Sequence, residues 1–284
     1  MAEHQTPGPA VLRIRLGATL RRLREARGIT AQQAADAIRG SDSKISRIEL
    51  GRHSAREIDV ADLLALYGVT DRAELAPLLA LAAAALAPPW WQPYVDVLPT
   101  WMQTYLGLEE AAAAAESYDT HFVPGVLQTP EYAAGLLART DFGPDQVSRL
   151  LAVRAERVAR FEAQGRRLTA VIDEAVLWRP VGDDGVLAGQ LRHLGDVATR
   201  PNVIIRIRRL AAGAPLAPAG FTILRSAEAG LPDVVCTEQL TSASYLDKPA
   251  EVARYAAVFD ALALSSEPAG QTGAIIDALL ADLG

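Results

Sequence analysis

The chain has 284 residues, of which half are hydrophobic and 22% are charged, and it contains one cysteine, Cys236. This composition predicts an ordered globular protein long enough for two domains. A single cysteine excludes an internal disulfide framework and fits a reducing cytoplasm. The first residues lack the basic start and apolar core of a signal peptide, and the apolar run at 78–86 is too short to span a bilayer. We therefore expect a cytoplasmic protein without a membrane segment.

The charge is unevenly distributed along the chain. Residues 11–56 hold eleven Lys and Arg against four Asp and Glu, whereas residues 88–284 hold 16 basic and 24 acidic residues. A basic block on an acidic body is typical of a nucleic-acid-binding module joined to an unrelated domain. Chance clustering of solvated charge is the alternative explanation.

The N-terminal part of the chain is predicted to be entirely helical. Residues 1–11, with two prolines and a glycine, indicate a disordered leader, and apolar periodicity begins directly after it. The first helix ends before Gly28, the second is capped by Thr30 and the third by Ser41. Two further helices are expected at about 58–67 and 72–86. Residues 12–87 are therefore predicted to form an all-α domain of five helices.

The rest of the chain, residues 88–284, is predicted to form a larger α+β domain. The prolines of the stretch 87–94 end the fifth helix and mark the domain boundary. Beyond it, the pattern predicts helices over 104–117, 129–139, 145–164, 186–199, 249–264 and 273–283, and strands over 168–173, 202–209, 220–225, 233–238 and 242–246. The short turns between the late strands favour an antiparallel sheet flanked by helices.

The second and third helices have the pattern of a helix-turn-helix. They are short, a tight turn at Arg39 and Gly40 joins them, and the third buries two isoleucines while it shows cations outward. The major groove of DNA admits one α-helix, and side chains near the N-terminus of that helix reach base edges. The residues predicted to read bases are Asp42, Ser43, Lys44 and Arg47, with helix capping as the alternative role of Asp42. The residues predicted to contact phosphates are Gln32, Gln33, Arg52 and His53.

The segment "LGATLRRLREARGITAQQAADAIRGSDSKISRIELGR" resembles the Xre/Cro type of helix-turn-helix domain, named after phage repressors. Spacing, turn and the ending "ISRIELG" all coincide with that family. The resemblance implies an internal ion pair between Arg24 and Glu49. A glutamate on a DNA-facing helix would repel phosphate unless it turned inward to a partner, and a solvated Glu49 is the alternative.

The later segment "WWQPYVDVLPTWMQTYLGLEEAAAAAESYDTHFVPGVLQTPEYAAGLLA", together with "VIDEAVLWRPVG" and "QLRHL", resembles a second family. This is the DUF5753 domain of Scr1-type, antitoxin-like transcriptional regulators from actinobacteria, and the resemblance runs from about Trp90 to Leu283. Relatives often lie beside small DUF397 proteins. The resemblance therefore implies a DUF397-type protein as a partner.

No catalytic or metal-binding constellation is evident in the sequence. The four histidines, at 4, 53, 121 and 193, are scattered, and none has the spacing of a zinc site. Cys236 lies in an apolar strand pattern, which favours a small core residue over a nucleophile. No glycine-rich phosphate loop is present. We therefore expect neither an enzyme nor a bound cofactor or metal.

An aromatic cluster lies just after the predicted domain boundary and consists of Trp90, Trp91, Tyr94, Trp101 and Tyr105. Aromatic walls with a few polar groups are how small-molecule pockets are usually built, so these residues could hold an unidentified effector. Alternatively, they clamp the two domains together or form a dimer interface. We favour the second interpretation.

Together these patterns predict a sequence-specific DNA-binding transcriptional regulator that acts as a homodimer. The third helix, about residues 42–50, would lie in the major groove of double-stranded DNA. The second domain would serve dimerisation, signal recognition or partner binding. One alternative is an antitoxin-like interaction module that binds a small DUF397-type partner and autoregulates, and another is a hydrolase with a DNA-binding tether.

Overall fold

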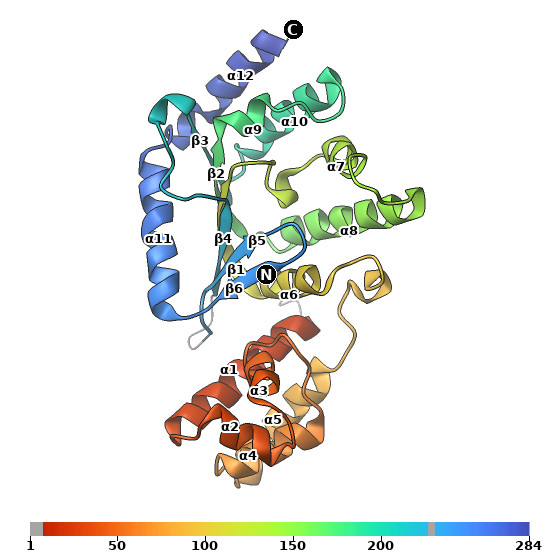
Figure 1. Cartoon of the computed structure of the whole chain (residues 1–284), viewed down its shortest axis with the longest axis vertical. Coiled ribbons are helices and arrows are strands. Elements are labelled where there is room, and N and C mark those ends of the chain that lie inside the picture. Colours follow the sequence, from red (N-terminus) through yellow and green to blue (C-terminus); the bar gives the residue numbers. More distant parts are fainter. Residues whose placement is uncertain (1–7, 227–230, 284) are drawn as a thin grey trace. The chain divides into compact units, whose positions relative to one another are not determined.

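The computed structural model describes residues 8–226 and 231–283, which divide into two compact units (Figure 1). The first unit consists of the described residues of Met1–Pro93, Met102–Ala111 and Ser226–Leu231, and the second unit consists of the remainder. Residues 1–7 of the expected leader lie outside the described residues. Residues 9–11 of the expected leader are helical, because Pro9 already begins the first helix, at a position where proline is favoured.

The first unit contains the five predicted helices, which are confirmed. They are α1 (Pro9–Ala26), α2 (Ala31–Ala37), α3 (Asp42–Glu49), α4 (Glu57–Leu66) and α5 (Arg72–Ala85). Local chemistry fixes their starts, because the side chain of Thr30 accepts from the backbone N–H of Gln33, and that of Ser41 accepts from the backbone N–H of Lys44. Their apolar faces share one core, which includes Leu20, Ile45 and Leu63.

The N-terminal helix packs unusually closely on the end of α3. A Cβ atom built on Gly17 would lie 2.3 Å from the carbonyl oxygen of Ile48, so only glycine permits this approach. Gly51 follows α3 with a φ of 65°, and a Cβ there would meet Ile14 at 2.5 Å. These two contacts fix α1 against the C-terminal end of α3.

The region after the boundary differs from its prediction. A helix was expected over 104–117, but α6 (Thr100–Ala111) ends earlier and the chain continues directly into strand β1 (Ala112–Asp119). Alanine favours helices, so local propensity indicated a longer helix. The tertiary environment overrides this propensity, since Ala114 to Asp119 pair with the neighbouring strand from Arg167 to Ile172.

The second unit contains a mixed six-stranded sheet in the order β3-β2-β1-β4-β5-β6. Its other strands are β2 (Arg167–Asp173), β3 (Val203–Arg208), β4 (Phe221–Ser226), β5 (Val234–Glu238) and β6 (Ala243–Leu246). The α+β fold with a sheet flanked by helices is confirmed. Strands β1, β2 and β3 are parallel, because helices connect them as crossovers, whereas β4, β5 and β6 are antiparallel. Gly220, just before β4, lies against the carbonyl of Tyr118 near the end of β1, so β1 and β4 also run antiparallel.

Helices cover both faces of this sheet (Figure 1). The crossovers contain η2 (Gly125–Leu127), α7 (Pro130–Leu137), α8 (Pro144–Ala163), α9 (Glu174–Trp178) and α10 (Asp184–Val197). The remaining elements are η1 (Gln92–Tyr94), η3 (Leu210–Ala212), α11 (Pro249–Leu264), η4 (Ala269–Gln271) and α12 (Thr272–Leu283). Ile172 packs with the core under α10 and α12, whereas its neighbour Val171 packs with Phe259 of α11. Successive residues of β2 therefore serve opposite faces of the sheet.

Candidate nucleic-acid interface

The turn between α2 and α3 has the geometry of a helix-turn-helix. Arg39 adopts a φ of 50°, in the left-handed region that a non-glycine residue enters only at some cost. Its side chain is exposed, immediately before the residues that cap and begin α3. The sequence prediction assigned Arg39 only to the turn, but its exposure beside the start of α3 makes it a candidate DNA contact.

The third helix divides its residues between core and solvent. Ile45 and Ile48 are almost fully buried. Asp42, Ser43 and Arg47 are exposed, and the Arg47 guanidinium Nε donates to the carbonyl oxygen of Ser43 at 3.2 Å. Three of the four predicted base-reading residues therefore share the solvent-facing side of α3.

Lys44 behaves differently from these three residues. Its side chain is 25% exposed, and its Nζ donates to Oδ2 of Asp59 on α4 at 3.0 Å. Asp59 is 2% exposed and also accepts from Arg56, whose Nη2 lies 2.6 Å from Oδ1 and whose Nε lies 3.1 Å from Oδ2. The hydrogen bond from Arg56, followed by that from Lys44, lowers the pKa of the Asp59 carboxyl group. The sequence prediction missed Asp59, although its place four residues before Leu63 puts it on the buried stripe of α4.

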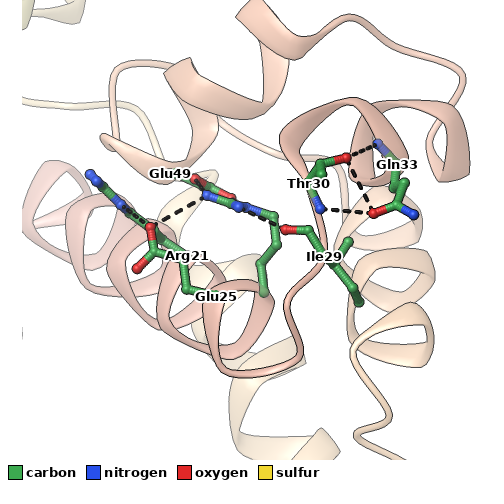
Figure 2. A network of polar contacts seen from close by, with 7 residues as sticks. Arg21, Glu25, Ile29, Thr30, Gln33 and Glu49 are labelled. Carbon is green, nitrogen blue, oxygen red and sulfur yellow. Dashed lines mark hydrogen bonds and ion pairs between the residues drawn. The ribbon is translucent and has the colours of Figure 1, made fainter.

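The four predicted phosphate-contacting residues lie at the start of α2 and just after α3. The Gln32 amide donates to Asp36 at 3.0 Å, and Gln33 completes a capping box with Thr30 (Figure 2). Arg52 is half-buried, and the exposed His53 places its Nδ1 2.6 Å from the carbonyl oxygen of Ser54. Their side chains therefore come from the first turn of α2 and from the loop that follows α3.

Arg24 of α1 and Glu49 of α3 form a bidentate ion pair. Arg24 Nε donates to Glu49 Oε1 at 2.6 Å, and its Nη2 donates to Oε2 at 2.9 Å. The two side chains are 13% and 7% exposed, and Arg24 Nη1 also donates to the carbonyl oxygen of Ile29 (Figure 2). The hydrogen bond that Arg24 donates to Glu49 raises the pKa of Arg24 further. Because Glu49 is turned inward and neutralised, it does not place a free negative charge on the α3 face.

The aromatic residues after the boundary belong to different units. Trp90 and Trp91 pack edge to face with ring centroids 5.5 Å apart, and Trp91 and Tyr105 are buried. These three residues lie in the first unit. In the second unit, the guanidinium carbon of Arg149 lies 5.9 Å from the ring centroid of Tyr94, and the carbonyl oxygen of Trp101 accepts from the hydroxyl of Tyr245. Within neither unit do all five aromatic residues come together.

The second unit gathers charged side chains near the carboxyl end of β1. Asp119 Oδ2 accepts from Ser117 Oγ at 2.7 Å, and Arg154 of α8 donates to the Gln128 amide oxygen at 2.5 Å. Burial is the main cause that raises the pKa of Asp119 to about 7, and the neighbouring Glu238 adds to the effect. Among residues 8–226 and 231–283, no group of three or more His, Cys, Asp or Glu side chains is arranged to hold a metal ion.

We expect Asp119→Asn to stabilise the second unit at pH 8 by about 1–2 kcal/mol, and to have little effect near pH 4. The pKa of Asp119 is higher in the folded state than in the unfolded state, so folding favours its protonated carboxyl group. The contribution of Asp119 to stability is therefore full below about pH 4 and is lost as the pH rises to about 7. Each unit of pKa corresponds to about 1.4 kcal/mol, and we discount the full shift because Asp119 is only partly buried. Urea unfolding of both proteins at pH 4, 6 and 8 measures the difference, and an equal effect at all three values would contradict the expectation.

The fold and the outward face of α3 define the class of this protein, a DNA-binding regulator of the helix-turn-helix type. A model described as a helix-turn-helix domain matches residues 15–78. A second model, described as the domain of unknown function DUF5753, matches residues 102–278. Because this match covers more than half of the chain, the chain belongs to the DUF5753 family. Neither a curated protein nor a solved structure matches the sequence of this chain. In the part of the chain that the structure describes, no helix is long and apolar enough to cross a membrane.

Proposed function

We propose that the chain is a sequence-specific transcriptional regulator and not an enzyme. The observation that carries this proposal is the division of α3, which buries Ile45 and Ile48 and exposes Asp42, Ser43 and Arg47. Arg47 can donate two hydrogen bonds to guanine, and Asp42 can accept from the cytosine amino group. The inward ion pair of Glu49 supports the proposal, because it removes the charge that would oppose phosphate.

We further propose that two copies bind a pseudo-palindromic operator. Each copy would place α3 in a major groove, with half-sites about 10 base pairs or a multiple of that apart. We propose that Gln32 and Gln33 at the start of α2, together with Arg52 and His53 after α3, contact phosphates and so fix the position of α3 on the duplex. A footprint of the protein on its selected DNA would reveal the half-site spacing, and sedimentation of the complex would give the number of copies.

The decisive experiment on base reading uses Arg47→Ala. DNA is first selected by the wild-type protein from a random pool, and binding to the selected and scrambled sequences is then titrated. We expect Arg47→Ala to weaken binding to the selected DNA by about 1–3 kcal/mol and to relax the base preference at one position per half-site, because a bidentate contact to guanine is lost.

The matched control is Arg72→Ala, which removes the same charge from an exposed position at the start of α5. It lies outside the helix-turn-helix and should leave base preference unchanged. If Arg47→Ala weakened binding to both DNAs equally, α3 would not read sequence through Arg47 and the base-reading proposal would fail.

The second unit is proposed to serve dimerisation, signal recognition or partner binding. The DUF5753 match at residues 102–278 does not overlap the helix-turn-helix match at residues 15–78, which supports a role separate from DNA contact. An antitoxin-like role, in which this unit binds a small DUF397-type protein and DNA binding is autoregulatory, is the alternative. Co-expression with the DUF397-type protein encoded nearest to this chain, followed by affinity purification, tests that partner directly.

A further inference from the structure

We propose that Asp59 keeps the charge of Lys44 away from DNA and thereby lowers the affinity of the protein for DNA of any sequence. This inference rests on the proposed function of α3 and changes the role that sequence position alone suggests for Lys44. Lys44 lies within the first turn of α3, between positions assigned to base reading. Its Nζ nevertheless bonds to a carboxylate of α4 that is 3% exposed, and not to the solvent-facing side of the helix.

Helix geometry explains why Lys44 is accessible to Asp59. Residues four apart lie on the same side of a helix, so Lys44 lies over Ile48, which is buried, whereas Ser43 lies over Arg47, which is exposed. The side chain of Lys44 is therefore only 25% exposed, and its ammonium group reaches the buried carboxylate of Asp59.

Electrostatics favours Asp59 over a phosphate as the partner of Lys44. The attraction between two opposite charges is about fourfold stronger at the effective dielectric constant of ~20 for partly buried pairs than at ~80 in water. Salt also screens an exposed phosphate contact, but it screens a shielded pair much less. Asp59 is held in place by Arg56, which is 70% exposed and bonds to both carboxylate oxygens.

This arrangement would lower the affinity of the protein for DNA of every sequence. Binding to any DNA sequence comes mainly from cations that displace counterions from phosphates, so each additional lysine strengthens correct and incorrect complexes alike. A base-reading arginine strengthens only the correct complex. If one cation is held at Asp59, affinity for every sequence is therefore lower, while the ratio between correct and incorrect DNA is still set by base contacts such as that of Arg47.

The test uses the full-length protein, the DNA selected by wild type from a random pool, and a scrambled version of that DNA. In Asp59→Asn the lysine is released, so we expect affinity for scrambled DNA to rise at least threefold at low salt. The slope of log affinity against log salt should steepen by about 0.9, the value for one additional phosphate contact. The affinity for selected DNA should rise by the same factor, so the ratio of the two affinities should stay within twofold of wild type. Asp59→Glu should restore both affinities and the salt slope toward wild type.

Two further variants separate this role from a merely structural one. Lys44→Met keeps the aliphatic stem, and it should leave both affinities within twofold of wild type and the salt slope unchanged. Asp59→Asn also weakens the ion pair with Arg56, so the double variant Asp59→Asn with Lys44→Met identifies the cation that is released. Its salt slope should return to the wild-type value, because Lys44 is gone. A structural defect caused by asparagine, or a new phosphate contact made by Arg56, would persist in the double variant.

Three results would overturn the inference. In the first, Lys44→Met loses more than fivefold in affinity for selected DNA and less in affinity for scrambled DNA, which would show that Lys44 reads bases. This result does not depend on whether Asp59→Asn folds. Another is an unchanged salt slope in folded Asp59→Asn. A wild-type protein without sequence preference would overturn the proposed function as well, whereas the first two results leave it intact.

Discussion

Replacing Glu49 by glutamine is expected to lower the free energy of unfolding of the first unit by about 3 kcal/mol. The change removes the counter-charge of Arg24 while it leaves the guanidinium shielded, and breaking a buried pair from one side costs about 3–5 kcal/mol. We take the lower end of this range because 13% of the Arg24 side chain remains exposed. Amide hydrogen exchange of α1 and α3 measures the loss in the relevant unit.

The control for this prediction lies in the same network. Glu25 is 54% exposed and pairs with Arg21 at 2.9 Å, four residues earlier on α1 (Figure 2). Glu25→Gln makes the same chemical change in solvent, and exposed pairs of this spacing contribute about 0.3–0.5 kcal/mol. If the two variants were destabilised equally, burial of the Arg24–Glu49 pair would not be what makes it important.

Replacing Gly17 by alanine is expected to destabilise the first unit by about 1–3 kcal/mol, the range for overpacking a close contact. The new Cβ would lie 2.3 Å from the Ile48 carbonyl oxygen and 2.6 Å from that of Glu49, so α1 must move away from α3. Neither neighbour can rotate aside, because both atoms belong to the backbone. We expect operator affinity to fall too, since α1 supports the end of the reading helix, and thermal unfolding together with DNA titration measures both effects.

Gly189 provides the matched control for this change. It lies within α10, and a Cβ there would meet nothing within 4 Å. In an open helical position, alanine is favoured over glycine by about 1 kcal/mol, so Gly189→Ala should stabilise the second unit. If alanine destabilised the protein at Gly17 and stabilised it at Gly189, lack of space and not helix propensity would decide the effect at Gly17. A neutral or stabilising Gly17→Ala would contradict the close packing.

The features that could be predicted from the sequence are those that depend on neighbouring residues. Thr30 and Ser41 cap α2 and α3 through bonds that span three residues, and Gly28 and Gly51 stop their helices with positive φ values. Apolar periodicity identified the five helices for the same reason, since each pattern lies within one helix. The late hairpin β5–β6 followed from its short turn.

Other features depend on residues far apart in the chain. Strand β1 begins with four alanines and lies at the centre of a sheet, where pairing with β2 on one side and β4 on the other outweighs the helix propensity of its residues. The parallel arrangement of β1, β2 and β3 likewise depends on how their crossover helices pack, which no local pattern encodes.

The DNA-facing side of α3 illustrates both kinds of determination. By itself, the sequence determined that α3 is a short capped helix with two buried isoleucines and an outward Arg47. Only the tertiary structure decided that Lys44 bonds to Asp59, which lies fifteen residues later in the chain. The physical reason is that a helical pattern fixes the side of the helix on which a residue lies, whereas the partner of a long, flexible lysine depends on which oppositely charged group packing brings within reach.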